Sequence, residues 1–341
     1  MPRVSVCIPS YQHKSFVKDS IYSVIAQTYQ DFEMVVTDDG STDGTVDIIE
    51  SINDPRLKLK RFPENRGACC ALNDTLQRAE GEYVCFLPSD DIFLPNKLEQ
   101  QVAYLDAHPE IGAVFSYPVF IDEGNNVIPD QSSTFNGNVF LMQNRSQSEW
   151  LRHFFFVGNC LCHPSLMIRK NCYAQLGAYD ERLAQLPDFE MWIRLLTAYP
   201  IHIMPEPLVG FRILNNGLNA SAPKPTSIVR INWEDVCIRR QYANFPDKLF
   251  AEIFEPEIKA LNIDQSIDRS IALGRICMAT NIDFLHRLGL ELLHDAIPAY
   301  SHGSNLKGIT YAEYIQNTGN ADIYNVLPAR KMKMIENILK A

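Results

Sequence analysis

Three pairs of polar residues follow apolar runs in the first hundred residues of the sequence. They are Ser10-Tyr11, Asp38-Asp39 and Asp90-Asp91, after the runs 4–8, 32–36 and 83–87. Neighbouring carboxylates repel each other and lose hydration at the end of a buried run, so a cation should lie nearby. Divalent cations such as Mg²⁺ bind one or two carboxylates together with phosphate oxygens and water. The pattern indicates a site for a divalent cation and a diphosphate, with an acidic turn or a helix cap as the alternative for each pair alone.

The elements around these pairs favour a common site. Apolar spacing predicts strands over 4–8, 32–36, 57–62 and 83–87, and helices over 16–27, 45–51, 68–79 and 95–107. Strands that alternate with helices form βαβ units around a mostly parallel sheet, which makes this an α/β protein. Ligands of such sheets bind outside the carboxyl ends of the strands. We therefore expect the three polar pairs to meet at one edge of the sheet.

The composition excludes several classes of protein. The chain has 341 residues, 46% of them hydrophobic and 21% charged, which is typical of a folded protein with a sizeable core. A net charge of −10 argues against a basic nucleic-acid-binding face, so we expect no nucleic acid as a partner. No apolar run approaches the ~20 residues of a membrane span, and the sequence starts without a signal-peptide core. Nine cysteines, several within apolar runs, suit reduced thiols in the cytoplasm.

The second half of the chain differs from the first. Strands and turns are expected over 113–137, a further strand over 166–168 and a helix over 189–198, before an Asn-, Pro- and Ser-rich linker over 215–227. Beyond the linker the spacing is helical, including 249–253 and 267–287. We predict a catalytic domain over 1–215 and an α-helical region over 216–341. The segment 329–341 pairs an apolar stripe with four basic residues, which suits peripheral contact with the inner membrane face, packing on the body, or a homodimer.

Other motifs give weaker indications. Cys160-x-Cys162-His163 could be half of a zinc site, but no second pair with suitable spacing follows, which favours buried thiols. The sequence lacks the glycine patterns of dinucleotide-binding and Walker loops. No serine elbow accompanies His163, so a positioning role for its imidazole is favoured over nucleophilic chemistry. Trp192 and Leu196, one helical turn apart, are expected in the core.

Taken together and in order, the motifs resemble the family 2 glycosyltransferases with a GT-A fold. The resemblance covers about residues 1–215. It rests on the segments 4–11, 23–29, 35–43, 65–67 (Asn-Arg-Gly), 81–83, 89–92 (Ser-Asp-Asp-Ile), 163–165 (His-Pro-Ser), 177–181 and 188–195. Such a fold is a Rossmann-like, mostly parallel sheet flanked by helices. The resemblance implies inverting transfer of a sugar from a nucleotide diphosphate donor, usually uridine-linked, with Mn²⁺ or Mg²⁺ as cofactor.

The resemblance also implies roles for individual residues. Pro9 and Tyr11 would line the nucleotide pocket with Arg66, and Asp39 would accept a hydrogen bond from uracil. Asp90 would bind the metal, with Asp91 beside it. Asp188 would be the catalytic base, because an inverting displacement needs one group to take the proton of the acceptor hydroxyl. A helix cap at Asp188 and a base at Glu190 are the alternatives from the residues alone.

Three positions depart from the family pattern. Pro88 replaces the first aspartate of the Asp-x-Asp motif, Leu72 stands where an arginine often precedes Asn73, and Leu214 stands where a histidine is common. These changes leave fewer ligands for a metal and a diphosphate. The favoured function is transfer of a sugar to a glycan or lipid-linked acceptor in surface polysaccharide biosynthesis. The alternative is a non-catalytic sugar-nucleotide-binding or scaffold protein with the same fold.

Overall fold

The computed structural model describes residues 1–341 except 132–137, 216–218, 220–223, 265, 298–309 and 321–341. Contacts between Cα atoms divide the chain into two units, Met1–Ser227 and Ile228–Ala341. The functional boundary that we predicted at residue 215 stays a prediction. The amphipathic segment 329–341 lies outside the described residues, as does most of the predicted linker.

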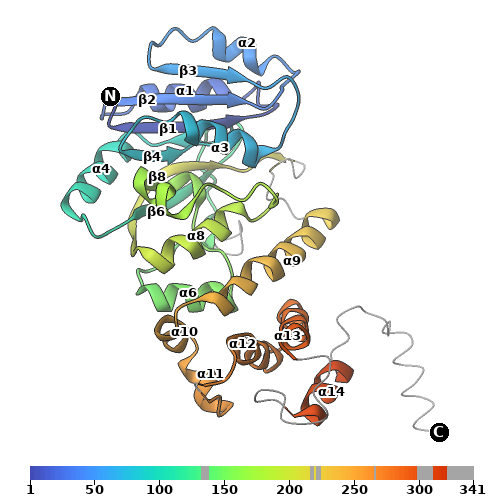
Figure 1. Cartoon of the computed structure of the whole chain (residues 1–341). Coiled ribbons are helices and arrows are strands. Elements are labelled where there is room, and N and C mark those ends of the chain that lie inside the picture. The colour runs from blue at the N-terminus through green and yellow to red at the C-terminus, as the bar shows by residue number, and fades with distance from the viewer. Residues whose placement is uncertain (132–137, 216–218, 220–223, 265, 298–309, 321–341) are drawn as a thin grey trace. The chain divides into compact units, whose positions relative to one another are not determined.

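An eight-stranded sheet forms the centre of the first unit, in the order β3-β2-β1-β4-β7-β6-β8-β5. Its strands are β1 (Val4–Ser10), β2 (Phe32–Asp38), β3 (Leu57–Arg61), β4 (Tyr83–Phe86), β5 (Ile92–Phe93), β6 (Ala113–Ile121), β7 (Met167–Arg169) and β8 (Ile201–Arg212). β1, β2, β3 and β4 are parallel, and the arrows of the first three point the same way in Figure 1. β6 and β8 are also parallel, whereas β7 and β5 pair antiparallel with their neighbours. The predicted mostly parallel sheet flanked by helices is confirmed.

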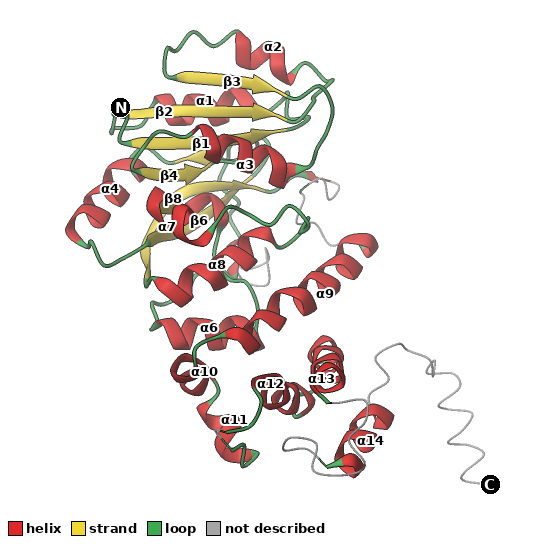
Figure 2. Cartoon of the chain, in the orientation of Figure 1, coloured by secondary structure: helices red, strands yellow, loops and turns green. Residues whose placement is uncertain are grey.

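Helices cover both faces of this sheet (Figure 2). They are α1 (Val17–Ile25), α2 (Thr45–Glu50), α3 (Ala68–Arg78), α4 (Lys97–Ala107), α6 (Gln147–Phe156), α7 (Lys170–Leu176) and α8 (Pro187–Ala198). Side chains alternate across a strand, so Val4, Val6 and Ile8 of β1 share one core with α1, α2 and α4. α3 contacts β1 and β2 through a separate buried stripe. Each predicted helix and strand up to residue 107 is confirmed to within three residues.

The order of the strands locates a crevice. From β1 the chain moves outward through β2 and β3, and then returns to place β4 on the other side of β1. This reversal makes the carboxyl ends of β1 and β4 a topological switch point, which is where open α/β sheets bind ligands. Ser10-Tyr11 lies at the end of β1 and Asp90-Asp91 follows β4, so the topology points to the same residues as the sequence.

The second unit is helical in its described residues, as predicted. Its helices are α10 (Asp247–Ile253), α11 (Glu255–Ala260), α12 (Arg269–Met278), α13 (Asp283–Ala296) and α14 (Tyr311–Asn320), and α9 (Pro225–Arg240) crosses the unit boundary. The prediction of helix throughout 267–287 is wrong, because α12 ends at Met278 and α13 starts at Asp283. There the Thr280 hydroxyl accepts from the Ile282 N–H, a side-chain bond that competes with helix continuation. No helix in the described parts of the chain is long and apolar enough to cross a membrane.

Candidate active site

The three polar pairs lie at the carboxyl ends of neighbouring strands, as expected from the sequence. Ser10 of β1 is in register with Asp38 of β2, and the Asp39 N–H donates to the Ser10 carbonyl at 2.8 Å. On the other side of β1, the Leu87 N–H donates to the Cys7 carbonyl at 2.9 Å and extends the pairing of β4. The chain segments that follow the three strands therefore start from one edge of the sheet.

Tyr11 stands at the rim of this edge. Its side chain is 41% exposed, whereas Pro9 before it is half-buried. The next residue, Gln12, has a left-handed φ of 54°, and its N–H donates to the Ser41 hydroxyl at 2.8 Å. This turn carries the chain away from the strand direction and leaves an aromatic ring accessible to a ligand.

The two aspartates at the end of β2 have different roles. Asp38 closes its own turn, because its carboxylate accepts from the N–H and the hydroxyl of Ser41 at 2.8 and 2.6 Å. Asp39 reaches the loop before α3, where its two oxygens accept from the N–H groups of Arg66 and Gly67 at 2.7 and 2.9 Å. Burial raises the pKa of Asp39. The Arg66 side chain is exposed, with its guanidinium 4.8 Å from the Phe62 ring. Asp39 thus holds the Arg66 loop next to the strand ends.

The pair after β4 also divides into a buried and an accessible member. Asp91 is 3% exposed, and its carboxylate accepts from the Arg212 N–H at 2.7 Å. Burial, and then the charge of Asp90, raise the pKa of Asp91 well above its usual range. The Asp90 side chain is 14% exposed, and its Oδ1 lies 3.9 Å from Nδ1 of His13. Of the two predicted metal ligands, Asp90 is the one that a ligand can reach.

A buried arginine fixes the turn that carries Asp90. The guanidinium of Arg212, at the end of β8, donates to the carbonyls of Asp90 and Asp122 at 2.6 and 2.7 Å and to Asn125 Oδ1 at 2.6 Å. It lies 5.0 Å from the Phe16 ring at the start of α1. Arg212 is not among the site residues predicted from the sequence. Its role depends on main-chain acceptors about ninety or more positions away, for which the sequence holds no local signal.

The residues at the strand ends could supply only part of the coordination shell of the predicted Mn²⁺ or Mg²⁺. In the part of the chain that the structure describes, no three His, Cys, Asp or Glu side chains gather closely enough to hold a metal ion. Magnesium in nucleotide sites needs only one or two carboxylates, with substrate phosphates and water as the other ligands. The accessible carboxylate of Asp90 supplies such an oxygen ligand, so the donor's diphosphate would have to complete the coordination.

Asp188 lies in the first turn of α8. Helix α8 begins with Pro187 after Leu186 as the N-cap residue, so the helix-cap interpretation of Asp188 is wrong. Its Oδ1 accepts from the Phe189 N–H at 2.8 Å and its Oδ2 from the Asn159 amide at 3.0 Å. The positive end of the helix dipole favours an ionised carboxylate at this position.

The end of β4 and helix α8 lie close together in the first unit. The ring of His163 contacts those of Phe86 in β4 and Trp192 in α8, with centroids 5.2 and 5.4 Å apart. Burial raises the pKa of the neighbouring Cys162 thiol well above its ordinary value, and the charges of Asp91 and Asp188 act in the same direction. The structure thus brings the end of β4 and helix α8 to the same region of the first unit.

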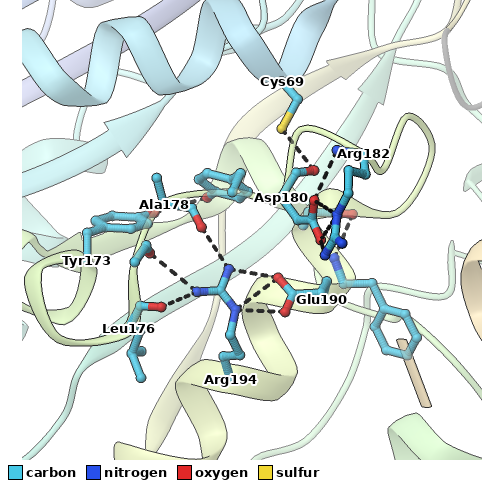
Figure 3. A network of polar contacts seen from close by, with 12 residues as sticks. Cys69, Tyr173, Leu176, Ala178, Asp180, Arg182, Glu190 and Arg194 are labelled. Atoms are coloured by element: carbon cyan, nitrogen blue, oxygen red, sulfur yellow. Dashed lines mark hydrogen bonds and ion pairs between the residues drawn. The ribbon is translucent and has the colours of Figure 1, made fainter. Parts of the chain in front are cut away.

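Glu190, the alternative base, is occupied by a structural ion pair. Arg194, one turn later on α8, donates through Nε and Nη2 to both carboxylate oxygens of Glu190 at 2.7–2.9 Å. The same guanidinium donates to the carbonyls of Leu176, Gly177 and Ala178, as Figure 3 shows. This network ties the loop after α7 to α8, so the Glu190 carboxylate has a structural role.

We expect Arg194→Lys to lower the free energy of unfolding by about 1–3 kcal/mol, since an ammonium cannot reproduce a bidentate pair together with three carbonyl contacts. Urea denaturation of the variant measures the loss. The affinity for a nucleotide should stay unchanged, because the network lies at α8 and not at the strand ends. A large loss of nucleotide affinity in a folded variant would contradict this separation.

His163 belongs to an aromatic cluster next to α8. Its Nε2 lies 3.0 Å from the Tyr179 hydroxyl, and its ring contacts those of Phe86 and Trp192. Burial lowers the pKa of His163 to about 3, so the imidazole is neutral at physiological pH. Trp192 and Leu196 are fully buried, as predicted. Cys160 is also buried, which raises the pKa of its thiol to about 12 and suits the buried-thiol interpretation.

Known proteins resemble this chain over most of its first unit. The family described as "Glycosyl transferase family 2" matches residues 5–173. An uncharacterized glycosyltransferase of Methanocaldococcus jannaschii is 30% identical over 219 residues, covering 63% of this chain and 72% of the relative. A putative teichuronic acid biosynthesis glycosyltransferase of Bacillus subtilis, TuaG, is 30% identical over 223 residues, covering 64% and 82%.

A solved structure shows the same fold. The S. aureus TarS fragment 1–349 in complex with UDP-GlcNAc superposes with a TM-score of 0.58 at 19% identity, covering 92% of this chain and 89% of that one. With the family match and the two relatives, this likeness identifies the sheet and its flanking helices as a GT-A fold. The chain belongs to glycosyl transferase family 2 and is a glycosyltransferase.

Proposed function

We propose that this enzyme transfers a sugar, with inversion, from a uridine diphosphate donor to a hydroxyl of a glycan or lipid-linked acceptor, with a divalent cation. The observation that carries the proposal is the arrangement of one accessible carboxylate after β4 and a second one, Asp188, at the start of α8. TuaG is named for teichuronic acid biosynthesis, and the TarS complex contains UDP-GlcNAc. The first supports a role in surface polysaccharide biosynthesis, and the second supports a UDP-sugar donor.

The donor is proposed to bind at the carboxyl ends of β1, β2 and β4. The exposed ring of Tyr11, the half-buried Pro9 and the Arg66 loop held by Asp39 would enclose the nucleotide. Asp90 would hold Mn²⁺ or Mg²⁺ together with the donor's phosphates. When bound, such a cation neutralises charge on the diphosphate leaving group.

The acceptor is proposed to bind on the α8 side. The ionised Asp188 takes the proton of the acceptor hydroxyl while that oxygen attacks the anomeric carbon. The new C–O bond forms as the bond from the anomeric carbon to the diphosphate breaks, so UDP leaves and the configuration inverts. No enzyme nucleophile is needed. The neutral His163 and the engaged Glu190 leave Asp188 as the base that the described geometry supports best.

A non-catalytic scaffold is the weaker alternative. Pro88, Leu72 and Leu214 motivated it, but Asp39, Asp90 and Asp188 are all retained. A cytoplasmic site at the inner face of the membrane would give access both to UDP-sugars and to lipid-linked acceptors, and this location is part of the proposal. A membrane contact or a homodimer through the helical region stays a prediction.

Thermal unfolding with nucleotides tests the donor class. At a ligand concentration 100 times its Kd, binding stabilises the native state by about 2.7 kcal/mol, which raises Tm by several degrees. We expect the largest shift with UDP plus Mn²⁺, a smaller one with UDP alone, and little with GDP or CDP. Release of UDP from UDP-GlcNAc should then be measurable, with water as a slow acceptor. A dominant shift with GDP would refute the uridine donor, and UDP binding without turnover of any UDP-sugar would favour the scaffold.

A further inference from the structure

Both oxygens of the Asp188 carboxylate accept a hydrogen bond from an N–H group. One donor is the main-chain N–H of Phe189 and the other is the side-chain amide of Asn159, 29 residues earlier in the chain. We propose that Asn159 is a positioning residue, which orients the Asp188 carboxylate and keeps it ionised for proton transfer. This inference rests on the proposed role of Asp188 as the base.

The turn after α6 positions the Asn159 side chain. The N–H groups of Val157 and Gly158 both donate to the His153 carbonyl, and Gly158 then adopts a left-handed φ of 120° that favours glycine. Asn159 follows, and its Oδ1 accepts from the Leu161 N–H at 3.1 Å. Because the amide oxygen is used in this way, the NH₂ group is the end that faces Asp188.

Helix α8, which carries Asp188, packs directly against α6, the helix that precedes Asn159. The rings of Phe154 in α6 and Phe189 in α8 make an edge contact with centroids 5.4 Å apart. At the other end of the pair, the Gln147 amide donates to the Leu196 carbonyl at 2.8 Å. Two helices in contact therefore hold α8 and the start of the short segment that leads to Asn159, which suits a group that must orient a reacting carboxylate.

The Asn159 amide is expected to stabilise the ionised form of the Asp188 carboxylate. An N–H group binds an ionised carboxylate more strongly than a protonated one, so it shifts the balance toward the form that can accept a proton. An amide carries no charge and does not titrate, so this effect persists over the whole working pH range. Loss of the donor should therefore appear as a loss of activity that begins at a higher pH.

Asn159→Asp separates this role from a structural one. The variant keeps an oxygen for the Leu161 N–H and the shape of the side chain, but it replaces the donor to Asp188 by a like charge. We expect the acidic limb of the rate–pH profile for UDP release from UDP-GlcNAc with Mn²⁺ to move up by about 1–2 pH units. The rate on the plateau should fall about tenfold, and the Tm shift given by UDP should stay the same.

Two further variants complete the experiment. Asn159→Ala removes the donor without adding charge, so it should move the acidic limb in the same direction and keeps the test valid if Asn159→Asp does not fold. Asn144→Asp is the matched control, because Asn144 binds only the main chain of Ile203, through both ends of its amide, in the bonds that the structure describes. It should lower Tm and leave the acidic limb in place.

The outcomes distinguish this inference from the proposed function. If wild type releases UDP, Asp188→Asn is inactive and the folded Asn159 variants keep the wild-type acidic limb, then Asn159 is not a positioning residue while the base assignment stands. If Asp188→Asn retains its activity, then the base assignment fails, and the Asn159 inference fails with it.

Discussion

Replacement of Asp188 by asparagine is expected to slow UDP release from UDP-GlcNAc by about 10²–10⁴-fold, the usual contribution of a general base. The substitution preserves size, and the amide oxygen can still accept from one of the two N–H donors. It cannot take a proton from the attacking hydroxyl or water. The rate–pH profile of the wild type should show an acidic limb that the variant lacks. The Tm shift given by UDP should be unchanged, since Asp188 is proposed to face the acceptor.

Glu190→Gln is the comparison that makes this result specific. Glu190 lies two residues further along α8 and is engaged by Arg194, so its replacement should lower Tm and leave most of the rate. Single-turnover measurements with saturating UDP-GlcNAc compare the two variants directly. A dead Glu190→Gln variant next to an active Asp188→Asn variant would overturn the assignment of the base.

Replacement of Asp90 is expected to abolish the stimulation of UDP binding by Mn²⁺. Asp90→Asn removes the one accessible carboxylate at the end of β4 and with it the charge that attracts the cation. Mutation of residues that only support the metal ligands typically lowers metal affinity by about 10–100-fold. Loss of a ligand should therefore lower the affinity for UDP in the presence of Mn²⁺ at least about tenfold. Calorimetric titration of UDP with and without Mn²⁺ gives the two affinities.

Asp91→Asn provides the matched control for this prediction. Asp91 is buried, its pKa is raised by burial and by the charge of Asp90, and an asparagine oxygen can still accept from the Arg212 N–H. The variant should therefore keep the stimulation by Mn²⁺. Loss of stimulation in Asp91→Asn with retention in Asp90→Asn would mean that the cation is held by the second carboxylate.

The sequence predicts the first half of the catalytic unit well because the information there is local. β1, β2 and β4 are short apolar runs, β3 alternates, each helix has a clear period, and the polar pairs lie at or just after the ends of β1, β2 and β4. To predict that these pairs lie together, one needs only the rule that parallel strands end at the same edge of a sheet. To predict which aspartate is structural, one needs the fold, since Asp91 is held by a bond to a residue 121 positions away.

There are physical reasons why the sequence did not predict the remaining elements. β8 contains Pro205 and Pro207, which normally argue against a central strand, and its pairing with β6 is irregular near Ser116 and Tyr117. α6 did carry a signal, the capping box of Ser146 and Glu149, which marks its first turn. The contact between Asn159 and Asp188 depends on how α6 packs on α8, and no short-range pattern contains it.

The late position of β8 has a consequence for biosynthesis. A ribosome releases the chain from its N-terminus, so β1 to β4 can pair once roughly the first ninety residues have emerged. Asp91 is then still without its donor, because Arg212 lies more than one hundred residues beyond the part of the chain that has emerged. β5 is also still unpaired at that stage, since β8 is its one neighbour in the described sheet. A nascent chain therefore acquires a parallel sheet early and completes the turn that carries Asp90 only when the last strand arrives.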